Sequence, residues 1–299
     1  MEYWLPIIYM GIMGLALLIY VILDGYDLGV GLLVPLADEA EKDMMIASIG
    51  PFWDANETWI VLGIGVLLIA FPVAHGIILT SLYLPVTLML MGLILRGVAF
   101  DLRVTAGGLQ SSTTSLLFSA LIAMTLPALY LILGCGWLLM KTDGDLRNKA
   151  IGWARMAIWP MGLGLFMVSI ATPMVSSSIA EKWFTLPNAL YLMPIPMVCV
   201  FCYGVIVMAL NKPTVLNQGY SWLIFACTVA ICLMASLGLA YSIFPDIVIG
   251  GLTIWESAAS VKSLQFTLVG VVITLPVILF YTFFVYRIFH GKATALSYE

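Results

Sequence analysis

The sequence predicts an all-α protein that crosses a membrane many times, built as two four-helix bundles with eight spans. Apolar residues make up 63% of the 299 positions and charged residues only 9%, and the mean hydropathy is +1.09. Too few polar residues remain to cover a soluble globule of this size, so lipid must contact most of the surface. A polar linker, 141–153, separates a first bundle, 1–140, from a second bundle, 154–299.

Charge and cysteine usage exclude several classes of function. The net charge is −4 and no run of lysine or arginine occurs, so we expect no nucleic-acid partner. The N-terminus is acidic and leads to no small-residue cleavage site, which favours an uncleaved first span. Cys199 and Cys202 form a C-x-x-C, but all five cysteines lie in apolar runs and no second pair completes a metal site. We therefore expect packing roles and no metal.

The first span begins with nineteen uncharged residues, Leu5 to Leu23, and continues as an apolar stretch to Leu36 after an Asp-Gly-rich segment. Within that segment Asp24 and Asp27 are three positions apart and share one helix face. Gly25 and Gly29 form a surface of small residues against which another helix can pack closely. An acidic loop, 37–43, is expected to follow.

The second span is expected to draw acidic residues into the membrane. Its charge-free part, Thr58 to Phe71, gives only ~21 Å of helix against a hydrocarbon core of ~30 Å. The helix must therefore include 51–57, which brings Asp54, Asn56 and Glu57 toward the bilayer. An ionisable group there indicates function. The simpler alternative is that Asp54 and Glu57 stabilise the start of the helix.

The other spans follow from the remaining apolar runs. A tight turn, 72–76, leads into a third span, 77–95, which ends at Arg96 and Asp101. Five more spans are expected at 115–140, 154–175, 189–210, 221–244 and 264–286. Prolines interrupt several of them, as is common where neighbouring helices satisfy the freed carbonyl groups.

Alternation of the spans places the membrane carboxylates on one side. The acidic cluster on that side comprises Asp24, Asp27, Asp54, Glu57, Arg96 and Asp101. Strict alternation of eight spans puts the basic residues Lys141, Arg147 and Lys149 on the opposite side, which fits the positive-inside rule poorly. An even number of crossings between Arg103 and Lys141 would place these basic residues on the same side as Lys42, Arg96 and Arg103. We expect both the cluster and the C-terminus to face the cytoplasm.

Four ordered motifs resemble subunit II of the cytochrome bd quinol oxidases, with the short cyanide-insensitive-oxidase branch most similar. The motifs are 23–31 (LDGYDLGVG), 49–59 (IGPFWDANETW), 95–101 (LRGVAFD) and 252–256 (LTIWE). The resemblance runs over most of the chain. It departs from the family in one respect: members usually have nine spans, and the sequence between Arg103 and Ser115 is too short for the fourth.

The resemblance implies a heterodimeric terminal oxidase of the bacterial inner membrane, which reduces oxygen to water. Subunit I of that family carries haems b and d and the quinol-oxidising loop, and subunit II is a haem-free scaffold that completes a proton route. It therefore implies no catalytic residue and no bound haem in this chain. A small single-helix accessory subunit is a further expected partner, and a quinone or lipid bound by this subunit stays an open question.

The resemblance assigns roles residue by residue. Asp54 matches the acid of the family's Trp-Asp pair and Asp24 the acid of its first span, and the proton-pathway candidates are Asp54, Asp24 and Glu57. The interface and structural candidates are Trp53, Asn56, Asp27, Arg96, Asp101, Trp255 and Glu256. The alternative for Asp24 is a structural ion pair with Arg96.

Two other functions for the whole chain stay open at this point. A proton-coupled secondary transporter would also bury carboxylates, although transporters usually carry paired broken helices in both halves. A purely structural assembly subunit would use the acids only to hold its partner. Only two histidines, His75 and His290, are present, so no histidine pair can ligate a haem inside a bundle.

Overall fold

The computed structural model describes residues 2–81, 113–175, 177–248 and 252–293, which are almost entirely helical. The longer helices are α1 (Trp4–Leu33), α2 (Glu39–Ile49), α3 (Trp53–Ala70), α4 (Pro72–Ser81), α6 (Thr113–Lys141), α7 (Gly144–Val175), α8 (Ser177–Phe184), α10 (Pro194–Asn211), α12 (Trp222–Ile243) and α13 (Val261–Ile288). The short elements are η1 (Val34–Leu36), α9 (Asn188–Leu192), α11 (Pro213–Val215), η2 (Leu216–Tyr220), β1 (Asp246–Val248) and β2 (Leu252–Thr253).

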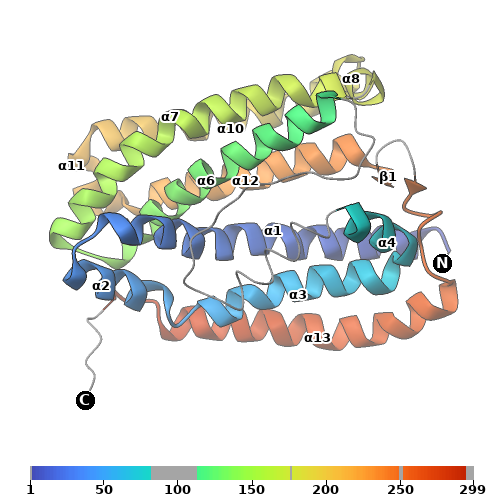
Figure 1. The fold of residues 1–299 in the computed structure, drawn as a ribbon, viewed down its shortest axis with the longest axis horizontal. Helices are drawn as coiled ribbons and strands as arrows, with labels where there is room; N and C mark the ends of the chain where they lie inside the picture. The colour runs from blue at the N-terminus through green and yellow to red at the C-terminus, as the bar shows by residue number, and fades with distance from the viewer. Residues whose placement is uncertain (1, 82–112, 176, 249–251, 294–299) are drawn as a thin grey trace.

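Helix α1 lies at the centre of the molecule (Figure 1). α6, α7, α10 and α12 lie on one side of it, and α3 and α13 lie on the other. α1 contacts α3, α6, α12 and α13. A side chain on α1 can therefore meet partners from both layers. We name the two ends of the molecule by what lies there: the α2 end and the hairpin end, where β1 pairs with β2.

The expected class, an all-α polytopic membrane protein, is confirmed. Among the described residues six helical segments are long and apolar enough to cross a membrane: Trp4–Leu36, Trp53–Ala70, Gly144–Met174, Asn188–Asn211, Gln218–Ile243 and Val261–Ile288. A shorter apolar helix, Thr125–Lys141, accompanies them. Most of the expected span 77–95 lies outside the described residues, so the number eight and the division into two bundles stay predictions.

The first span is a single helix through its acidic segment. α1 stays helical past Asp24 and Asp27 and ends at Leu33, so both acids lie within the helix. The predicted close packing at Gly25 and Gly29 is confirmed, and the partner is α6. A Cβ added at Gly25 would lie 3.0 Å from the ring of Tyr130, and one at Gly29 would overlap the Tyr130 carbonyl.

Two expected loops are helices instead. The predicted acidic loop, 37–43, is wrong because α2 begins at Glu39. Asp38 and Glu41 form a capping box there, in which the Asp38 backbone N–H donates to the Glu41 carboxylate at 3.0 Å. The predicted turn, 72–76, is wrong because α4 begins directly at Pro72. Proline suits a first helical position, where its missing N–H leaves no carbonyl unpaired.

Several other helices begin or end at different residues from the predicted spans, mostly because the helices are longer. α7 begins at Gly144, ten residues before the expected start at Ala154, so most of the segment 141–153 is helical. The expected span 189–210 is divided at Met193 into α9 and α10. α12 and α13 match the spans expected at 221–244 and 264–286 to within three residues at each end.

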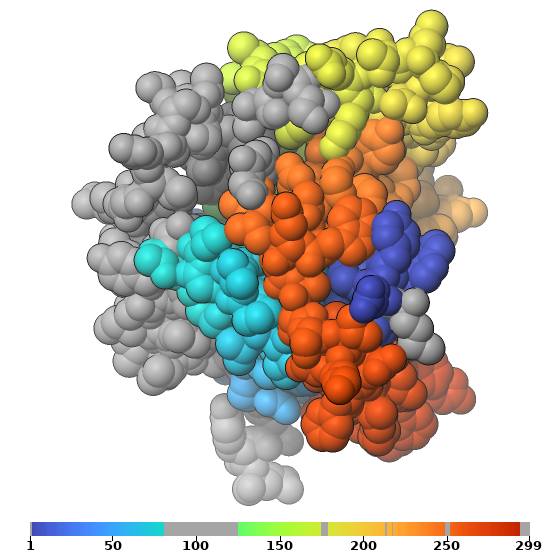
Figure 2. All heavy atoms as spheres, turned by 90° about the vertical axis from the view of Figure 1, so that its right-hand side faces the viewer, coloured from blue at the N-terminus to red at the C-terminus, as the bar shows by residue number. Residues whose placement is uncertain are grey.

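A second hydrophobic core closes the hairpin end. It joins the start of α1 to the end of α3 and to the hairpin segment through Tyr9, Phe71 and Ile254, all fully buried. The Tyr9 hydroxyl donates to the Leu264 carbonyl at 2.8 Å, which fixes the start of α13. Figure 2 shows this end, where the orange hairpin segment lies between cyan α4 and the blue N-terminal residues.

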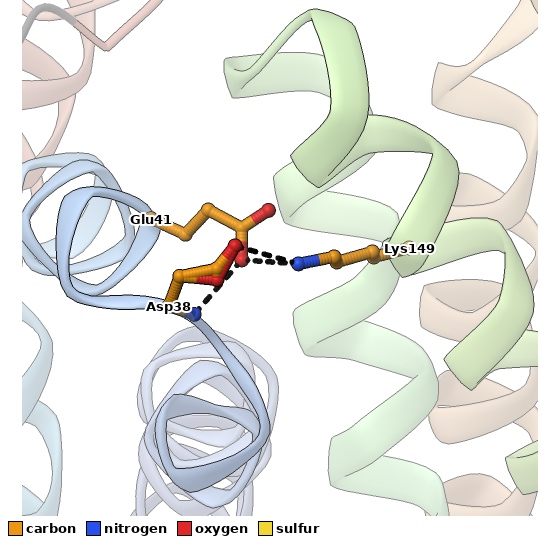
Figure 3. Close-up of polar contacts among 3 residues, drawn as sticks. All are labelled: Asp38, Glu41 and Lys149. Atoms are coloured by element: carbon orange, nitrogen blue, oxygen red, sulfur yellow. Dashed lines mark hydrogen bonds and ion pairs between the residues drawn. The ribbon is translucent and has the colours of Figure 1, made fainter.

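The α2 end is held by ion pairs between the two layers. Lys149 of α7 points at both acidic side chains before and within α2 (Figure 3). Its Nζ lies 3.0 Å from Asp38 Oδ2 and 2.8 Å from Glu41 Oε2. The segment 141–149 therefore lies at the same end of the molecule as the connection between α1 and α2. The opposite placement, which strict alternation of eight spans predicted, is wrong.

Acid is expected to weaken this contact at Asp38. The hydrogen bond from Lys149, assisted by its charge, holds the pKa of Asp38 below its ordinary value of 3.8. The unfolded chain therefore takes up this proton first as the pH falls. The Lys149 contact therefore stabilises the folded protein fully at pH values above the ordinary pKa of Asp38. This stabilisation is lost as the pH falls through the lower pKa that Asp38 has in the folded protein.

Thermal denaturation of the purified protein checks this expectation at neutral pH and at about pH 3. The acid-induced decrease in midpoint should be smaller in Lys149→Gln than in the parent chain. Lys42→Gln is the matched control, because Lys42 pairs with Glu39 of its own helix. An equal decrease in the Lys149→Gln and Lys42→Gln proteins would contradict the assignment.

Candidate functional site

The two acids of α1 lie inside the molecule. Asp24 and Asp27 expose only 4% and 7% of their surface. α1 packs between α3 and α6, and the 3.6-residue period turns both acids away from lipid. A buried carboxylate needs hydrogen bonds or charge partners, so their surroundings determine what they can do.

Two tyrosines, Tyr20 and Tyr130, interact with Asp24. Tyr20, one turn earlier on α1, hydrogen-bonds to Asp24, and the charge of Glu57 also acts on Tyr20. Tyr130 of α6 lies close enough to interact electrostatically with Asp24. A hydroxyl group both donates and accepts hydrogen bonds, so these neighbours can receive and release a proton.

Asp27 faces an amide instead. The Asn56 side chain donates from Nδ2 to Asp27 Oδ2 at 2.7 Å and to the Tyr26 hydroxyl at 3.0 Å. The Tyr286 hydroxyl of α13 donates to Asn56 Oδ1 at 2.9 Å and lies 2.6 Å from the Tyr26 hydroxyl. Tyr26 and Asn56 are fully buried. This polar cluster joins α1, α3 and α13.

Helix α3 separates its polar residues onto two faces. Residues 56, 59, 63, 66 and 70 are buried, at intervals of three or four positions that match the helical period. Asp54 is exposed and Glu57 is half-buried, and both lie on the opposite face. The same helix therefore presents Asn56 to this chain and Asp54 to its surroundings.

The surroundings of Asp54 fit contact with another molecule. Its Oδ2 accepts a long hydrogen bond of 3.4 Å from the Tyr281 hydroxyl of α13. The neighbouring Trp53 keeps 39% of its surface exposed. Glu57 follows Asp54 by three positions, which is the spacing of neighbours on one helix face. Asp54 and Glu57 therefore follow one another along α3, and the charge of Glu57 acts on Tyr20, which hydrogen-bonds to Asp24 of α1.

Trp255 and Glu256 lie at the other end of the molecule. The Trp255 indole donates to the Tyr3 carbonyl at 3.1 Å, and Glu256 accepts from the Thr253 backbone N–H at 2.9 Å. That backbone bond, with a second from the Thr253 hydroxyl, holds the pKa of Glu256 below its ordinary value. α3 is ~27 Å long, so these two residues close the hairpin end and do not join the acidic cluster.

The remaining predicted residues are placed only in part. Arg96 and Asp101 lie outside the described residues, so the predicted pair of Asp24 and Arg96 stays a prediction. Within the described ranges no group of three or more His, Cys, Asp or Glu side chains is arranged to hold a metal ion. His75 lies in α4 at the hairpin end, and His290 follows α13 at the α2 end.

Tyrosines are the residues of the candidate site that could not be predicted from the sequence motifs. Tyr20 precedes Asp24 by four positions and could have been found from helical spacing alone. Tyr281 and Tyr286 are 227 and 230 positions away from the α3 residues that they contact. Nothing in the local pattern of either segment indicates that pairing.

Comparison with known families gives a match over nearly the whole chain. A family model described as cytochrome bd terminal oxidase subunit II matches residues 5–120 and 105–289. In solved structures, the bd oxidase from Geobacillus thermodenitrificans superposes with a TM-score of 0.73 at 15% identity, covering 95% of this chain and 98% of that one. At this identity the superposition shows the fold alone.

Curated relatives match over shorter segments. Cytochrome bd ubiquinol oxidase subunit 2 of Bacillus subtilis is 42% identical over 83 residues, which is 27% of this chain and 25% of the relative. Cytochrome bd-I ubiquinol oxidase subunit 2 of Escherichia coli is 34% identical over 94 residues, 31% of this chain and 25% of the relative. The alignments thus span about a quarter of each relative's length.

Proposed function

This chain belongs to the cytochrome bd terminal oxidase subunit II family, and from this premise we propose that it is the haem-free subunit of a membrane quinol:oxygen oxidoreductase. The observation that carries the proposal is the family match, which runs from residue 5 to residue 289. The partner is a subunit I that carries haems b and d and oxidises quinol. The role of this chain is to hold that partner and to supply protons to it.

The proton route proposed for this chain begins at Asp54. Asp54 is exposed at the start of α3, next to the exposed indole of Trp53, where a partner subunit can cover both. Glu57 lies one turn further along α3, and its charge acts on Tyr20. Tyr20 hydrogen-bonds to the buried Asp24. Carboxyl and hydroxyl groups therefore succeed one another from the surface to the interior.

The chemistry of these groups suits a relay. A carboxylate takes up a proton reversibly, and partial desolvation favours its neutral form. A hydroxyl group passes a proton by accepting one hydrogen bond while donating another. When bound, the haems of the partner supply the electron transfer and the oxygen chemistry. The residues of this chain only hold and move protons on the way there.

The charge distribution supports a cytoplasmic α2 end. The basic residues at this end include Lys42, Lys141, Lys149 and Lys292, and the last pairs with Asp143 at 3.0 Å. Cytoplasmic segments of membrane proteins carry an excess of lysine and arginine. The described acids Asp24, Asp27, Asp54 and Glu57 and the described end of the chain at residue 293 share this end, so protons would enter from the cytoplasm.

Purification of the chain from its native membrane tests the proposal. We expect it to travel with a second, histidine-bearing membrane subunit that shows haem absorption, and we expect the complex to consume oxygen when quinol is supplied. Purification of the chain alone, without haem and without oxygen consumption, would overturn the proposal and favour a proton-coupled transporter.

A further inference from the structure

The hydroxyl and amide hydrogens around Asn56 can be assigned one by one. Tyr286 has one hydroxyl hydrogen, and it points to Asn56 Oδ1, which can only accept. The hydrogen between the two phenols must therefore come from Tyr26, which donates to Tyr286 at 2.6 Å. Tyr26 in turn accepts from Asn56 Nδ2 at 3.0 Å. The three side chains form a closed ring in which every hydrogen bond runs in the same direction.

The backbone of α1 sets the direction of this ring. A reversed ring would exchange the amide oxygen and nitrogen of Asn56. The amide oxygen would then face the Leu23 carbonyl, which lies 3.2 Å from Nδ2 and can only accept hydrogen bonds. Two facing acceptors repel one another in an interior of low dielectric constant. The amide N–H groups of Asn56 therefore stay turned toward α1.

The fixed amide favours the ionised state of Asp27, because a hydrogen bond that is donated to a carboxylate stabilises its charged form. The N–H that does not enter the ring points to Asp27 Oδ2 at 2.7 Å, a length typical of a hydrogen bond to a charged acceptor. Asp27 Oδ2 is thus held as an acceptor. An amide N–H that is donated to a carboxylate does not pass a proton on, because the amide nitrogen is neither acidic nor basic near neutral pH. Asp24 instead interacts with Tyr20 and Tyr130, whose hydroxyl groups can pass a proton on.

We propose that Tyr26, Asn56 and Tyr286 are positioning residues that keep Asp27 ionised and exclude it from proton transfer. The two buried acids of α1 then have different tasks: Asp24 exchanges protons, and Asp27 is a fixed charge. The statement about proton transfer rests on the function proposed above. The statement about the ring rests on the hydrogen-bond geometry, and the statement that Asp27 is ionised rests on that geometry together with the stabilisation of a carboxylate by a donated hydrogen bond.

Infrared difference spectroscopy of the whole complex tests whether Asp27 takes part in proton transfer. During quinol-driven turnover at neutral pH, a relay acid gives a band of a protonated carboxyl group that appears or disappears. We expect such bands to be altered in Asp24→Asn and to be unchanged in Asp27→Asn. A protonated-carboxyl band that is lost in Asp27→Asn would overturn the proposal.

A double-mutant cycle tests the ring and does not depend on turnover. Tyr26→Phe and Tyr286→Phe each open the same ring, so the double variant should lower the denaturation midpoint by less than the sum of the two single decreases. Tyr203→Phe is the control, since its hydroxyl donates to the Ile158 carbonyl at 3.2 Å, outside the ring. Its decrease should add fully to that of Tyr26→Phe. Full additivity of the two ring variants would overturn the proposal.

The two tests separate this inference from the proposed function. Normal oxygen consumption in both Asp54→Asn and Asp24→Asn would refute the proton route. The infrared difference spectra of Asp27→Asn and the double-mutant cycle would still decide whether the ring acts as described.

Discussion

Oxygen consumption by the assembled complex is expected to fall roughly 10²-fold when Asp54 is replaced by asparagine, the usual range for loss of a proton-transferring side chain. Asparagine has nearly the same shape and can still accept the hydrogen bond from Tyr281, but it cannot take up a proton at neutral pH. Because Asp54 is exposed at the start of α3, the exchange leaves the hydrophobic core unaltered. The folded complex should therefore survive with its proton supply slowed.

The measurement compares quinol-driven oxygen consumption per haem in the parent complex and the variant. Asp43→Asn is the matched control, because Asp43 is an exposed acid of the neighbouring helix α2. It should leave the rate unchanged. Unchanged turnover in Asp54→Asn, with normal haem content, would exclude Asp54 from the proton route.

Haem content separates a proton relay from a scaffold. If Asp54 served only to dock the partner subunit, its replacement would reduce the haem that copurifies with the chain, and the rate per remaining haem would stay normal. A relay predicts the opposite combination, full haem and slow turnover. The two roles therefore differ in two independent measurements on one preparation.

The placement of the acidic residues in α3 could be predicted because it follows from length. A charge-free run of fourteen residues is too short to cross a bilayer, so the helix had to include its acids, and α3 does begin at Trp53. Which way each acid points could not be predicted with the same certainty. The apolar residues of α3 surround the helix almost evenly, so the buried face depends on the contacts with α1 and α13.

Two segments that composition predicts to be loops, 37–43 and 72–76, form the starts of helices in the structure. A cluster of acids reads as a solvated loop, yet Asp38 and Glu41 have the spacing of a capping box and start α2. Pro72 reads as a turn, yet proline is well suited to begin a helix. In both cases residues that disfavour the interior of a helix favour its first turn.

Lys141 shows why some polar positions cannot be read from the sequence. It ends an apolar helix and is expected in solvent, but it is 6% exposed. Its Nζ donates to the carbonyls of Phe289 and Gly291 and lies about 5 Å from the rings of Phe52 and Trp137. The carbonyl groups left unpaired after α13 supply its partners. Only the folded arrangement brings the ends of α6 and α13 together.

A substitution at the close contact between α1 and α6 is expected to have the second large effect, a loss of stability. A Cβ added at Gly134 of α6 would lie 2.5 Å from the backbone of Gly29 and Val30, and one at Gly29 would overlap the Tyr130 carbonyl. The two glycines face each other, so the backbones touch without side chains between them. Dispersion contacts between helices are the main attraction inside a bilayer, and such contacts require this proximity.

Gly29→Ala is therefore expected to destabilise the fold by roughly 3 kcal/mol or more, at the upper end of what overpacking costs. A single methyl group would force α1 away from α6, and backbone atoms cannot move aside as a flexible side chain can. The same displacement would disturb Asp27 and Tyr26, which flank this part of α1. Thermal denaturation of the purified complex, together with its yield, measures the effect.

Gly31→Ala is the control that isolates this contact from helix propensity. Nothing lies within 4 Å of a Cβ added at Gly31, two positions further along the same helix. Alanine favours a helix over glycine by about 1 kcal/mol, so this variant should be neutral or slightly more stable. Opposite signs at two neighbouring glycines can arise only from the contact with α6. Equal effects at both positions would mean that α1 and α6 are further apart in the protein than the packing of Gly29 against Gly134 requires.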